Sequence, residues 1–344
     1  KKLIEITHIV NSDNLLKEYL PYSKMNKNDR ANAINNLIFN DSLEYNTVFN
    51  IFNSLKSDNE LFIQYKQSQD IINESNLLKK YLSEVNDTLE NAIYSHSHAK
   101  KQLMKVIAQW VNGEQTGYCF GFEGSPGIGK TSLAKNGLSK CLIDENNNTR
   151  PFSFIALGGS SNGSSIEGHS YTYVSSTWGR IVDILMESKC MNPIIYIDEL
   201  DKVSKTEHGR EIIGIFTHLI DSTQNNSFQD KYFSGIDIDL SKVLFIFSYN
   251  DPEQVDSILL DRIHRIKFEN LSIEDKVVIV KKYIIPELNF KMGFDKIIEI
   301  DDDTIQYIIE EYTNEPGVRK LKELFFDLFG EINIELLSNI IDTD

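Results

Sequence analysis

The octapeptide Gly124-Ser-Pro-Gly-Ile-Gly-Lys130-Thr131 matches the pattern G-x-x-x-x-G-K-T and decides the fold class of the chain. An apolar run at residues 119–122 precedes it, and a run with helical patterning follows from Thr131 onward. In this strand–loop–helix context the glycines let backbone N–H groups curl around phosphates, and the N-terminus of the helix adds partial positive charge. We therefore expect Lys130 to reach the β- and γ-phosphates of a nucleotide and Thr131 to hold Mg²⁺. The alternative is a chance glycine-rich turn, and the flanking strand and helix argue against it.

Compact apolar runs recur after residue 117, each bounded by Gly, Pro, Asn or Asp, with helical patterns between them. They lie at residues 119–122, 152–157, 194–197 and 243–247. Strands that alternate with helices are typical of a parallel sheet covered by helices on its faces. The sequence therefore predicts an α/β fold with a doubly wound, mostly parallel sheet.

Two carboxylates end the apolar run at residues 194–197, in the stretch Ile-Ile-Tyr-Ile-Asp198-Glu199. A strand of a parallel sheet delivers such side chains to the carboxyl edge, where ligands of α/β proteins bind. We expect Asp198 to hold the shell of Mg²⁺, and Glu199 to orient and deprotonate the attacking water. Acidic residues often end strands, but together with the phosphate loop the pair indicates a hydrolytic nucleotide site.

Asn250 ends another apolar run, residues 243–247 with Ser-Tyr-Asn after them. An amide at the carboxyl edge could position the water beside the γ-phosphate. The alternative is an Asn that only starts a turn before Asp251 and Pro252.

Helical patterns flank the α/β region on both sides. Residues 61–93 contain neither Gly nor Pro, and one apolar stripe at helical spacing includes Leu78, Leu82, Val85, Leu89 and Ile93. We expect this helix to pack on its own domain, with pairing to a neighbouring subunit as the alternative. After residue 270, Ser272 and Asp275 predict a capping box for a helix running toward Pro286. The acidic residues 301–303 are expected to lie at the N-terminus of a following helix, where they interact favourably with its partial positive charge.

These patterns divide the chain into four predicted parts. Residues 1–60 form a helical N-terminal region and residues 61–93 a long connecting helix. Residues 94–270 form a large α/β nucleotide-binding domain, and residues 271–344 a small, all-helical domain.

The composition is that of a protein with a substantial core, at 41% hydrophobic and 25% charged residues. The formal net charge of −16 argues against a chain that coats nucleic acid or an anionic membrane. No apolar run approaches the 18 residues of a membrane-spanning helix, and the N-terminal residues lack a signal-peptide core. Three widely spaced cysteines indicate free thiols. We therefore expect an intracellular, soluble protein of a reducing compartment, either cytoplasmic or its mitochondrial or viral-factory equivalent.

Residues 89–337 resemble the AAA+ ATPase module of Lon-type ATP-dependent proteases. The resemblance rests on collinear stretches beyond the phosphate loop: GSPGIGKTSLAK, ALGG, IEGHSYTYVSSTWGRI, NPIIYIDELDK, DSTQNNSFQDKY, DLSKVLFIFSYN, LLDRIHRI and EYTNEPGVRKL. It implies an α/β P-loop AAA+ domain, an all-α C-terminal lid and a helical N-terminal arm.

The resemblance also assigns residues to an ATP·Mg²⁺ site. The phosphate loop supplies Gly124, Ser125, Pro126, Gly127, Ile128, Gly129, Lys130, Thr131 and Ser132. Asn250 matches sensor 1, Arg262 the arginine finger that reaches the nucleotide of the adjacent subunit, and Arg319 sensor 2 on the lid. Both guanidinium groups suit this task because they stay charged beside a transferring phosphoryl group; surface salt bridges are the alternative for each. Tyr94 matches a position beside the adenine pocket.

Tyr173 and Val174 fall where such ATPases place an aromatic–aliphatic pair on a loop that faces a central pore. The alternative is a Tyr buried at a strand edge. Residues 204–210 would form a second pore loop. The chain departs from the family at Glu167, at Ser170-Tyr171 and at Trp178, where the family usually has Arg, basic residues and Pro. Its Ile93-Tyr94-Ser95 replaces the family's His-Tyr-Gly.

The resemblance implies a homo-hexamer that hydrolyses ATP to unfold and thread protein substrates through its pore. Lon-type proteases carry a Ser–Lys dyad after the lid, and we expect no peptidase site within these 344 residues. The alternatives are a stand-alone remodelling ATPase, or a nucleotide-gated scaffold or nucleic-acid-handling ATPase; nucleic acid is not indicated as a partner. His96 and His98 are expected to be solvated at a helix start rather than to bind metal.

Overall fold

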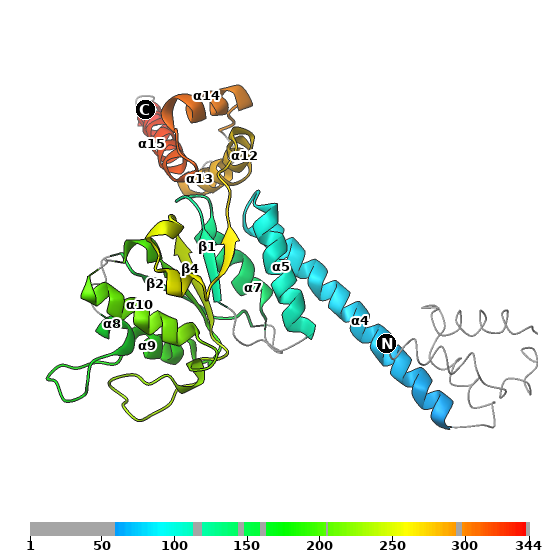
Figure 1. Ribbon diagram of the computed structural model, residues 1–344. Helices are drawn as coiled ribbons and strands as arrows, with labels where there is room; N and C mark the ends of the chain where they lie inside the picture. The colour runs from blue at the N-terminus through cyan, green and yellow to red at the C-terminus, as the bar shows by residue number, and fades with distance from the viewer. Residues whose placement is uncertain are drawn as a thin grey trace, which may run out of the picture. The chain divides into compact units, whose positions relative to one another are not determined.

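The computed structural model describes residues 59–112, 119–143, 148–158, 163–203, 206–293 and 298–341 (Figure 1). The chain divides into two compact units, Lys1–Ser83 and Glu84–Asp344. In the first unit the described residues belong to one helix, α4 (Asn59–Ala92), which continues into the second unit. The helical region predicted at residues 1–60 lies almost entirely outside the described residues.

The described residues form a five-stranded sheet with the order β2-β3-β4-β1-β5, in which every neighbouring pair is parallel. The predicted parallel α/β sheet is therefore confirmed. The strands are β1 (Cys119–Glu123), β2 (Phe152–Ala156), β3 (Ile194–Asp198), β4 (Leu244–Tyr249) and β5 (His264–Lys267).

Helices cover both faces of this sheet, which explains why its central strands are apolar throughout. Every residue of β1 and β4 is buried. In Figure 1, α8 (Ser164–Glu167), α9 (Arg180–Ser188) and α10 (Glu207–Ile220) lie on one side, and α5 (Ser97–Asn112) lies on the other. Short elements complete this domain: η4 (Leu200–Lys202), η5 (Asn225–Ser227), η6 (Pro252–Gln254) and α11 (Ser257–Leu260).

The helix that follows the phosphate loop runs without a break through α6 (Lys130–Ser132), a π-helical turn η3 (Leu133–Leu138) and α7 (Ser139–Cys141). A Cβ on Gly137 would lie 3.2 Å from side-chain atoms of Leu89 and Ala92. The end of α4 therefore packs tightly on this helix. Of the predicted apolar stripe, Val85 and Leu89 are buried, whereas Leu78 is exposed.

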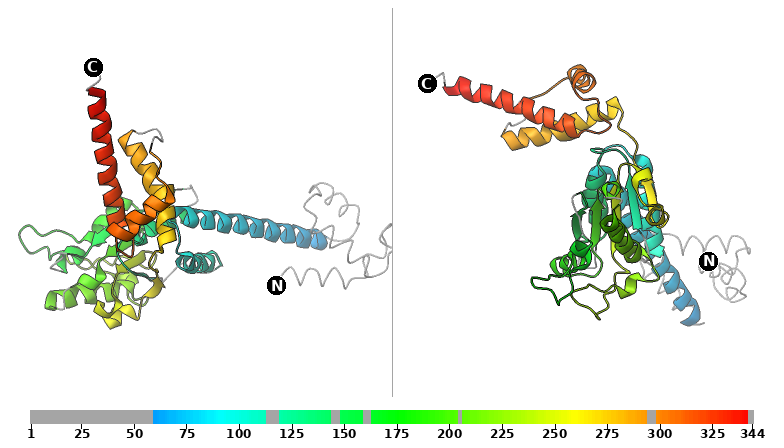
Figure 2. Two further views of the ribbon diagram at one scale, coloured as in Figure 1. Left: turned by 90° about the horizontal axis from the view of Figure 1, so that it is seen from above. Right: turned by 60° about the vertical axis from the view of Figure 1, so that its left-hand side comes forward.

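The C-terminal part is all helical, as predicted. It contains α12 (Ile273–Ile279), a π-helical turn η7 (Val280–Ile284), α13 (Ile285–Met292), α14 (Asp302–Tyr312) and the long α15 (Arg319–Ile341), which reaches toward the C-terminus in Figure 2. Their apolar faces enclose a separate core that includes Leu321, Phe325 and Phe329.

Two predicted helix starts are confirmed here. Ser272 and Asp275 form a reciprocal capping box at α12, and Asp301 accepts the Thr304 backbone N–H at 2.8 Å to cap α14. A cap of this kind typically stabilises a helix by about 1 kcal/mol. The helix continues past Pro286. Proline lacks a backbone N–H donor, and the π-helical turn η7 directly before it widens the helix at the point where that donor is missing.

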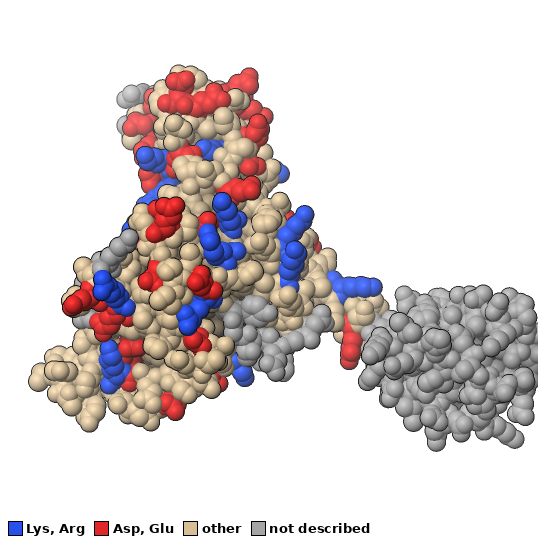
Figure 3. All heavy atoms as spheres, viewed as in Figure 1, with Lys and Arg blue, Asp and Glu red and all other residues tan. Residues whose placement is uncertain are grey.

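Charge is distributed unevenly over this fold. On the face seen in Figure 3, acidic side chains gather over the lid helices at the top of the picture. Helix α14 alone carries Asp302, Asp303, Glu310 and Glu311. None of the described helices combines the length and the apolar character that crossing a bilayer requires.

Candidate nucleotide-binding site

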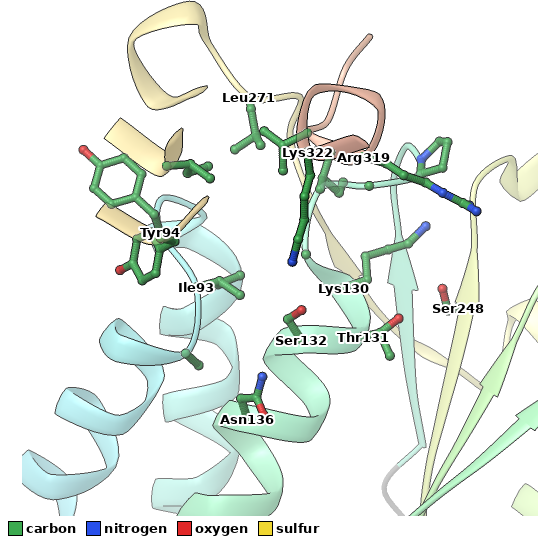
Figure 4. Close-up of a pocket in the computed structure, with 18 of the residues that line it drawn as sticks. Ile93, Tyr94, Lys130, Thr131, Ser132, Asn136, Ser248, Leu271, Arg319 and Lys322 are labelled. Atoms are coloured by element: carbon green, nitrogen blue, oxygen red, sulfur yellow. The ribbon is translucent and has the colours of Figure 1, made fainter. Parts of the chain in front are cut away.

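A cavity of about 1000 Å³ lies over the carboxyl ends of β3 and β4 and the start of the phosphate-loop helix. Its walls also include the α4–α5 connection and the lid helices α13 and α15. In Figure 4, Ile93 and Tyr94 lie on one side of this cavity and Lys130 and Thr131 on the other. The site therefore combines groups from six separate stretches of the sequence.

The phosphate loop adopts a conformation that its glycines make possible. Gly127 and Gly129 have φ angles of 77° and 100°, in the region that L side chains rarely adopt. A Cβ on Gly124 would lie 2.8 Å from the backbone oxygen of Phe268. Because these positions carry no side chain, phosphate oxygens can approach the backbone N–H groups of the loop closely.

Lys130 is buried at the start of the helix, and its ammonium has three oxygen partners. It donates to the carbonyl of Gly124, to the carbonyl of Tyr249 at 3.0 Å and to Asn250 Oδ1 at 2.9 Å. Burial lowers the pKa of Lys130 to about 8, while the charges of Asp198 and Asp201 act in the opposite direction. A desolvated cation among oxygen acceptors is the group that an anionic phosphate would stabilise.

Thr131 and Asp198 supply the oxygen atoms that Mg²⁺ prefers. Asp198 ends β3 and Thr131 lies one residue into the helix, and both line the cavity. The Thr131 hydroxyl donates to the phenolic oxygen of Tyr196 at 3.2 Å. A single carboxylate and a hydroxyl suit a hydrated Mg²⁺ that takes its other ligands from phosphates and water. These two residues therefore fit the predicted metal site.

Glu199 follows Asp198 in a strained backbone conformation, with φ at 62°. This conformation turns its carboxylate toward Gly158, where an added Cβ would lie 1.7 Å from Glu199 Oε2. Oε1 pairs with Lys202 in the next turn. Glu199 thus lies at the wall of the cavity, with its carboxylate held between Gly158 and Lys202.

Asn250 lies directly after β4, and its side-chain oxygen accepts a hydrogen bond from the Lys130 ammonium. Its backbone N–H donates to Asp201 Oδ2 at 3.1 Å, and that of Asp251 donates to the same oxygen at 3.3 Å. Asp201 thus ties the end of β4 to the turn after β3. This buried carboxylate was not predicted; the second aspartate of Asp-Glu-Leu-Asp was the available signal in the sequence.

The lid reaches the phosphate loop through the segment before α15. The Val318 N–H donates to the carbonyl of Gly127 at 3.1 Å, and a Cβ on Gly317 would lie 2.5 Å from the carbonyl carbon of Gly127. Arg319 lines the cavity with an exposed side chain, 3.8 Å from Glu323. Lys322, which the sequence analysis did not select, lines the cavity as well and pairs with Glu287 at 2.7 Å.

Tyr94 lines the cavity beside Ile93, with the Lys282 ammonium 6.0 Å from its ring centre. Ser95 and His96 follow with φ angles of 65° and 57°. The family's glycine would adopt this conformation without strain at the position of Ser95.

His96 is buried rather than solvated, so the expectation was wrong for this residue, whereas His98 is exposed near the start of α5 as expected. The Nε2 of His96 lies 2.9 Å from the carbonyl oxygen of Ile128, beneath the phosphate loop. Burial lowers its pKa. No local sequence pattern could have indicated this contact, because its partner lies 32 residues away.

Other predicted residues lie away from this cavity. Arg262 does not line it and pairs with Asp221 at 3.5 Å. Tyr173 and Val174 lie on a loop with 70% and 98% exposure, so the alternative of a buried tyrosine is wrong. Of the second predicted loop, residues 204 and 205 lie outside the described residues, and α10 begins at Glu207.

Comparison with known families identifies two domains. Residues 120–271 match the AAA family of ATPases associated with various cellular activities. Residues 292–325 match the Lon protease AAA+ ATPase lid domain. The two matches correspond to the α/β domain and to part of the helical lid.

Similar proteins include a Lon protease homolog of Acanthamoeba polyphaga mimivirus, 40% identical over 260 residues, or 75% of this chain and 25% of that protein. The mitochondrial Lon protease homolog of Candida albicans is 33% identical over 260 residues, covering 75% and 23%. Lon protease 2 of Borreliella burgdorferi is 35% identical over 267 residues, covering 77% and 32%. The chain thus spans about a quarter to a third of the length of these relatives. With its parallel sheet, phosphate loop and Lon-type lid, this chain belongs to the Lon-type AAA+ ATPases.

Proposed function

We propose that this chain is the ATP-hydrolysing motor of a Lon-like ATP-dependent protease, and that it unfolds and threads protein substrates. The observation that carries the proposal is the convergence of Lys130, Thr131, Asp198, Glu199 and Asn250 on one cavity, with lid residues over it. Each of these groups has a distinct part in phosphoryl transfer to water.

Binding of ATP would use the buried charge of Lys130 and the backbone of the glycine loop. The Lys130 ammonium exchanges carbonyl partners for β- and γ-phosphate oxygens, and the N–H groups of the loop donate to the same anion. Thr131 and Asp198 hold Mg²⁺, which neutralises charge on the phosphates when bound. Tyr94 and Ile93 offer apolar surface for the adenine ring.

Hydrolysis would then depend on Glu199 and Asn250. The Glu199 carboxylate accepts a proton from a water whose oxygen attacks the γ-phosphorus, while the bond to the β–γ bridging oxygen breaks and ADP leaves. To do so, Glu199 exchanges its Lys202 partner for that water. The Asn250 amide, held by Asp201 through its backbone, orients the water. Arg319 stabilises the developing charge from the lid.

A complete site would need a second subunit. The Arg262 side chain is 40% exposed and points to a partner on its own domain, Asp221, rather than into its own cavity. An arginine finger that acts in the neighbouring subunit requires such a peripheral position. We therefore propose a homo-hexameric ring in which Arg262 reaches the adjacent nucleotide.

The exposed Tyr173 and Val174 would face the pore of this ring. A flat ring and a branched side chain can grip an extended polypeptide of almost any sequence, because both use apolar contact. In this proposal, residues 94–270 are the nucleotide-binding motor domain and residues 271–344 are the lid domain. Residues 1–60 and 61–93 form an N-terminal arm.

The direct test measures unfolding of a stably folded protein with a fluorescent reporter by the full-length protein, with ATP or ADP. The proposal predicts fluorescence loss with ATP alone, and none for Lys130→Ala. Nucleotide hydrolysis without any loss of fluorescence would contradict the unfoldase function and favour a remodelling or scaffold role.

A further inference from the structure

The exposed loop that carries Tyr173, here named the tyrosine loop (residues 168–179), has an ordered base and two internal turns. The base is closed by a hydrogen bond from the His169 N–H to the Thr177 carbonyl, at 2.9 Å. The Tyr173 N–H donates to Ser170 O at 3.1 Å, and that of Ser176 donates to Tyr173 O at 3.2 Å. The tip is therefore shaped by its own backbone, whereas its direction depends on what holds the base.

A single buried carboxylate holds that base. Asp230 is 0% exposed, and its Oδ2 accepts the Gly179 N–H at 2.8 Å. Its Oδ1 accepts the Tyr232 N–H at 2.8 Å, and a Cβ on Gly168 would lie 2.7 Å from the same oxygen. Both ends of the tyrosine loop thus pack against one charged group, whose burial is balanced by backbone donors.

Asp230 belongs to a different part of the chain, here named the anchor segment (residues 228–238). Lys231 adds two links from this segment to Glu167, through its backbone N–H at 2.7 Å and its ammonium at 3.2 Å. Trp178 stacks on Phe233 with ring centres 6.1 Å apart and meets Tyr232 edge-on at 5.8 Å. Polar and aromatic contacts therefore fix the tyrosine loop to the anchor segment together.

The anchor segment leads directly to the nucleotide site. A bridge between Phe228 and Ile238 closes it, and the chain then passes Leu240, which is 0% exposed, into β4. The last residue of β4 and the next one, Asn250, hold the Lys130 ammonium. The anchor of the tyrosine loop is thus joined to the groups around the phosphates by β4 and a short turn, in which Leu240 and Val243 are buried.

We propose that Asp230 is a positioning residue that couples the nucleotide site to the tyrosine loop, with Trp178 as its aromatic support. This inference rests on the proposed function, because it assigns the loop a mechanical role in substrate movement. Movement of β4 and Asn250 is passed to the loop because the base follows the anchor segment.

The test compares Asp230→Asn with Asp239→Asn in the full-length protein. An amide at position 230 accepts one of these two backbone N–H groups and presents a donor to the other. The change therefore removes either the Gly179 link to the loop or the Tyr232 link that orients the side chain within the anchor segment. Asp239 lies on the same stretch but only caps a local turn, accepting the Ser241 N–H at 2.9 Å. It therefore serves as a matched control for loss of one carboxylate charge.

For Asp230→Asn we expect basal kcat and KM for ATP within about twofold of wild type, and at least fivefold more ATP consumed per substrate molecule unfolded. Hydrogen exchange should accelerate at least tenfold at whichever of the Gly179 and Tyr232 amides loses its acceptor. The Asp239→Asn protein should match wild type in all these measurements. Should Asp230→Asn not fold, Trp178→Ala tests the same coupling, with the same directions expected.

Unchanged ATP consumption per unfolded substrate in Asp230→Asn or Trp178→Ala, measured beside an active wild type, would overturn the coupling role. So would unchanged exchange at both amides, a result that is informative without any substrate. A different result would contradict the proposed function instead: the wild type fails to unfold substrates, while hydrogen exchange is still accelerated in the variant. Asp230 would then have only a structural role.

Discussion

Lys130 is a cation placed where water reaches it poorly, and this placement has a measurable consequence. Its pKa of about 8 reflects burial, which disfavours the charged form more than Asp198 and Asp201 favour it. A bound triphosphate adds negative charge beside the ammonium and raises that pKa again. Nucleotide binding must therefore take up a proton at alkaline pH, when part of the free protein has a neutral Lys130.

Nucleotide affinity should consequently fall as pH rises through 8, by about tenfold for each further pH unit while the bound form stays protonated. Fluorescence titration with a labelled, non-hydrolysable ATP analogue between pH 7 and 9.5 measures this. The control is Lys130→Arg, whose guanidinium stays charged over the whole range and should give a flat profile. A flat profile for the wild type would contradict the buried-cation account.

Gly158 tests the position of the Glu199 carboxylate. Because a Cβ there would lie 1.7 Å from Glu199 Oε2, Gly158→Ala should displace the carboxylate and lower kcat for ATP at least tenfold. The nucleotide affinity should remain within about threefold. The matched control is Gly214→Ala in α10, where an added Cβ meets nothing within 4 Å; this change should leave kcat unchanged. Equal kcat in both variants would mean that Glu199 acts from another position.

At this scale, the sequence predicted the residues whose role follows from a local motif. Lys130, Thr131 and Asp198 all line the cavity as expected. Asp201 and His96 escaped prediction because their importance comes from contacts with Asn250 and Ile128. Those partners come near only once the sheet and the phosphate loop have folded.

Among the elements, the lid and the phosphate loop are in close backbone contact. A Cβ on Gly317 would lie 2.5 to 2.7 Å from backbone atoms of Pro126 and Gly127. Backbone on both sides cannot give way as a flexible side chain can, so the two segments must separate if residue 317 is enlarged.

Gly317→Ala should therefore lower the stability of the protein by about 2 kcal/mol or more and weaken ATP-analogue binding at least tenfold. Thermal unfolding and titration measure the two effects. Gly330→Ala in α15, where a Cβ meets nothing within 4 Å, should raise stability by about 0.5 to 1 kcal/mol. If Gly317→Ala bound the ATP analogue as tightly as wild type, the contact between lid and phosphate loop would have no part in nucleotide binding.

Elements with a strong pattern were predicted well, and those defined by tertiary contact were not. The four apolar runs correspond to β1 to β4. Three of these strands, β1, β3 and β4, lie inside the sheet, and a strand covered on both faces is apolar throughout. The edge strand β5 has one buried residue, Ile266, among His264, Arg265 and Lys267, and so lacks an apolar run. The π-helical turns of η3 and η7 left no pattern that periodicity could detect.

For the whole molecule, the central prediction is that subunits complete each other's sites. Arg262→Ala and Lys130→Ala proteins should each be nearly inactive as ATPases. Mixed rings should recover part of the activity, because some interfaces pair an intact phosphate loop with an intact Arg262. ATPase assays over a range of mixing ratios measure this, with subunit exchange followed by mass. Exchange without any recovery would place the function of Arg262 within its own subunit.

Activation of water by Glu199, in the cavity that it shares with Lys130 and Asp198, is the central step of the proposed mechanism. The most direct measurement compares ATP binding and single-turnover hydrolysis in wild type and Glu199→Gln. We predict that the variant binds ATP within about threefold of wild type, while hydrolysis falls at least a hundredfold, as loss of a general base requires. Hydrolysis at the wild-type rate would contradict the account, because water activation would then belong to another group.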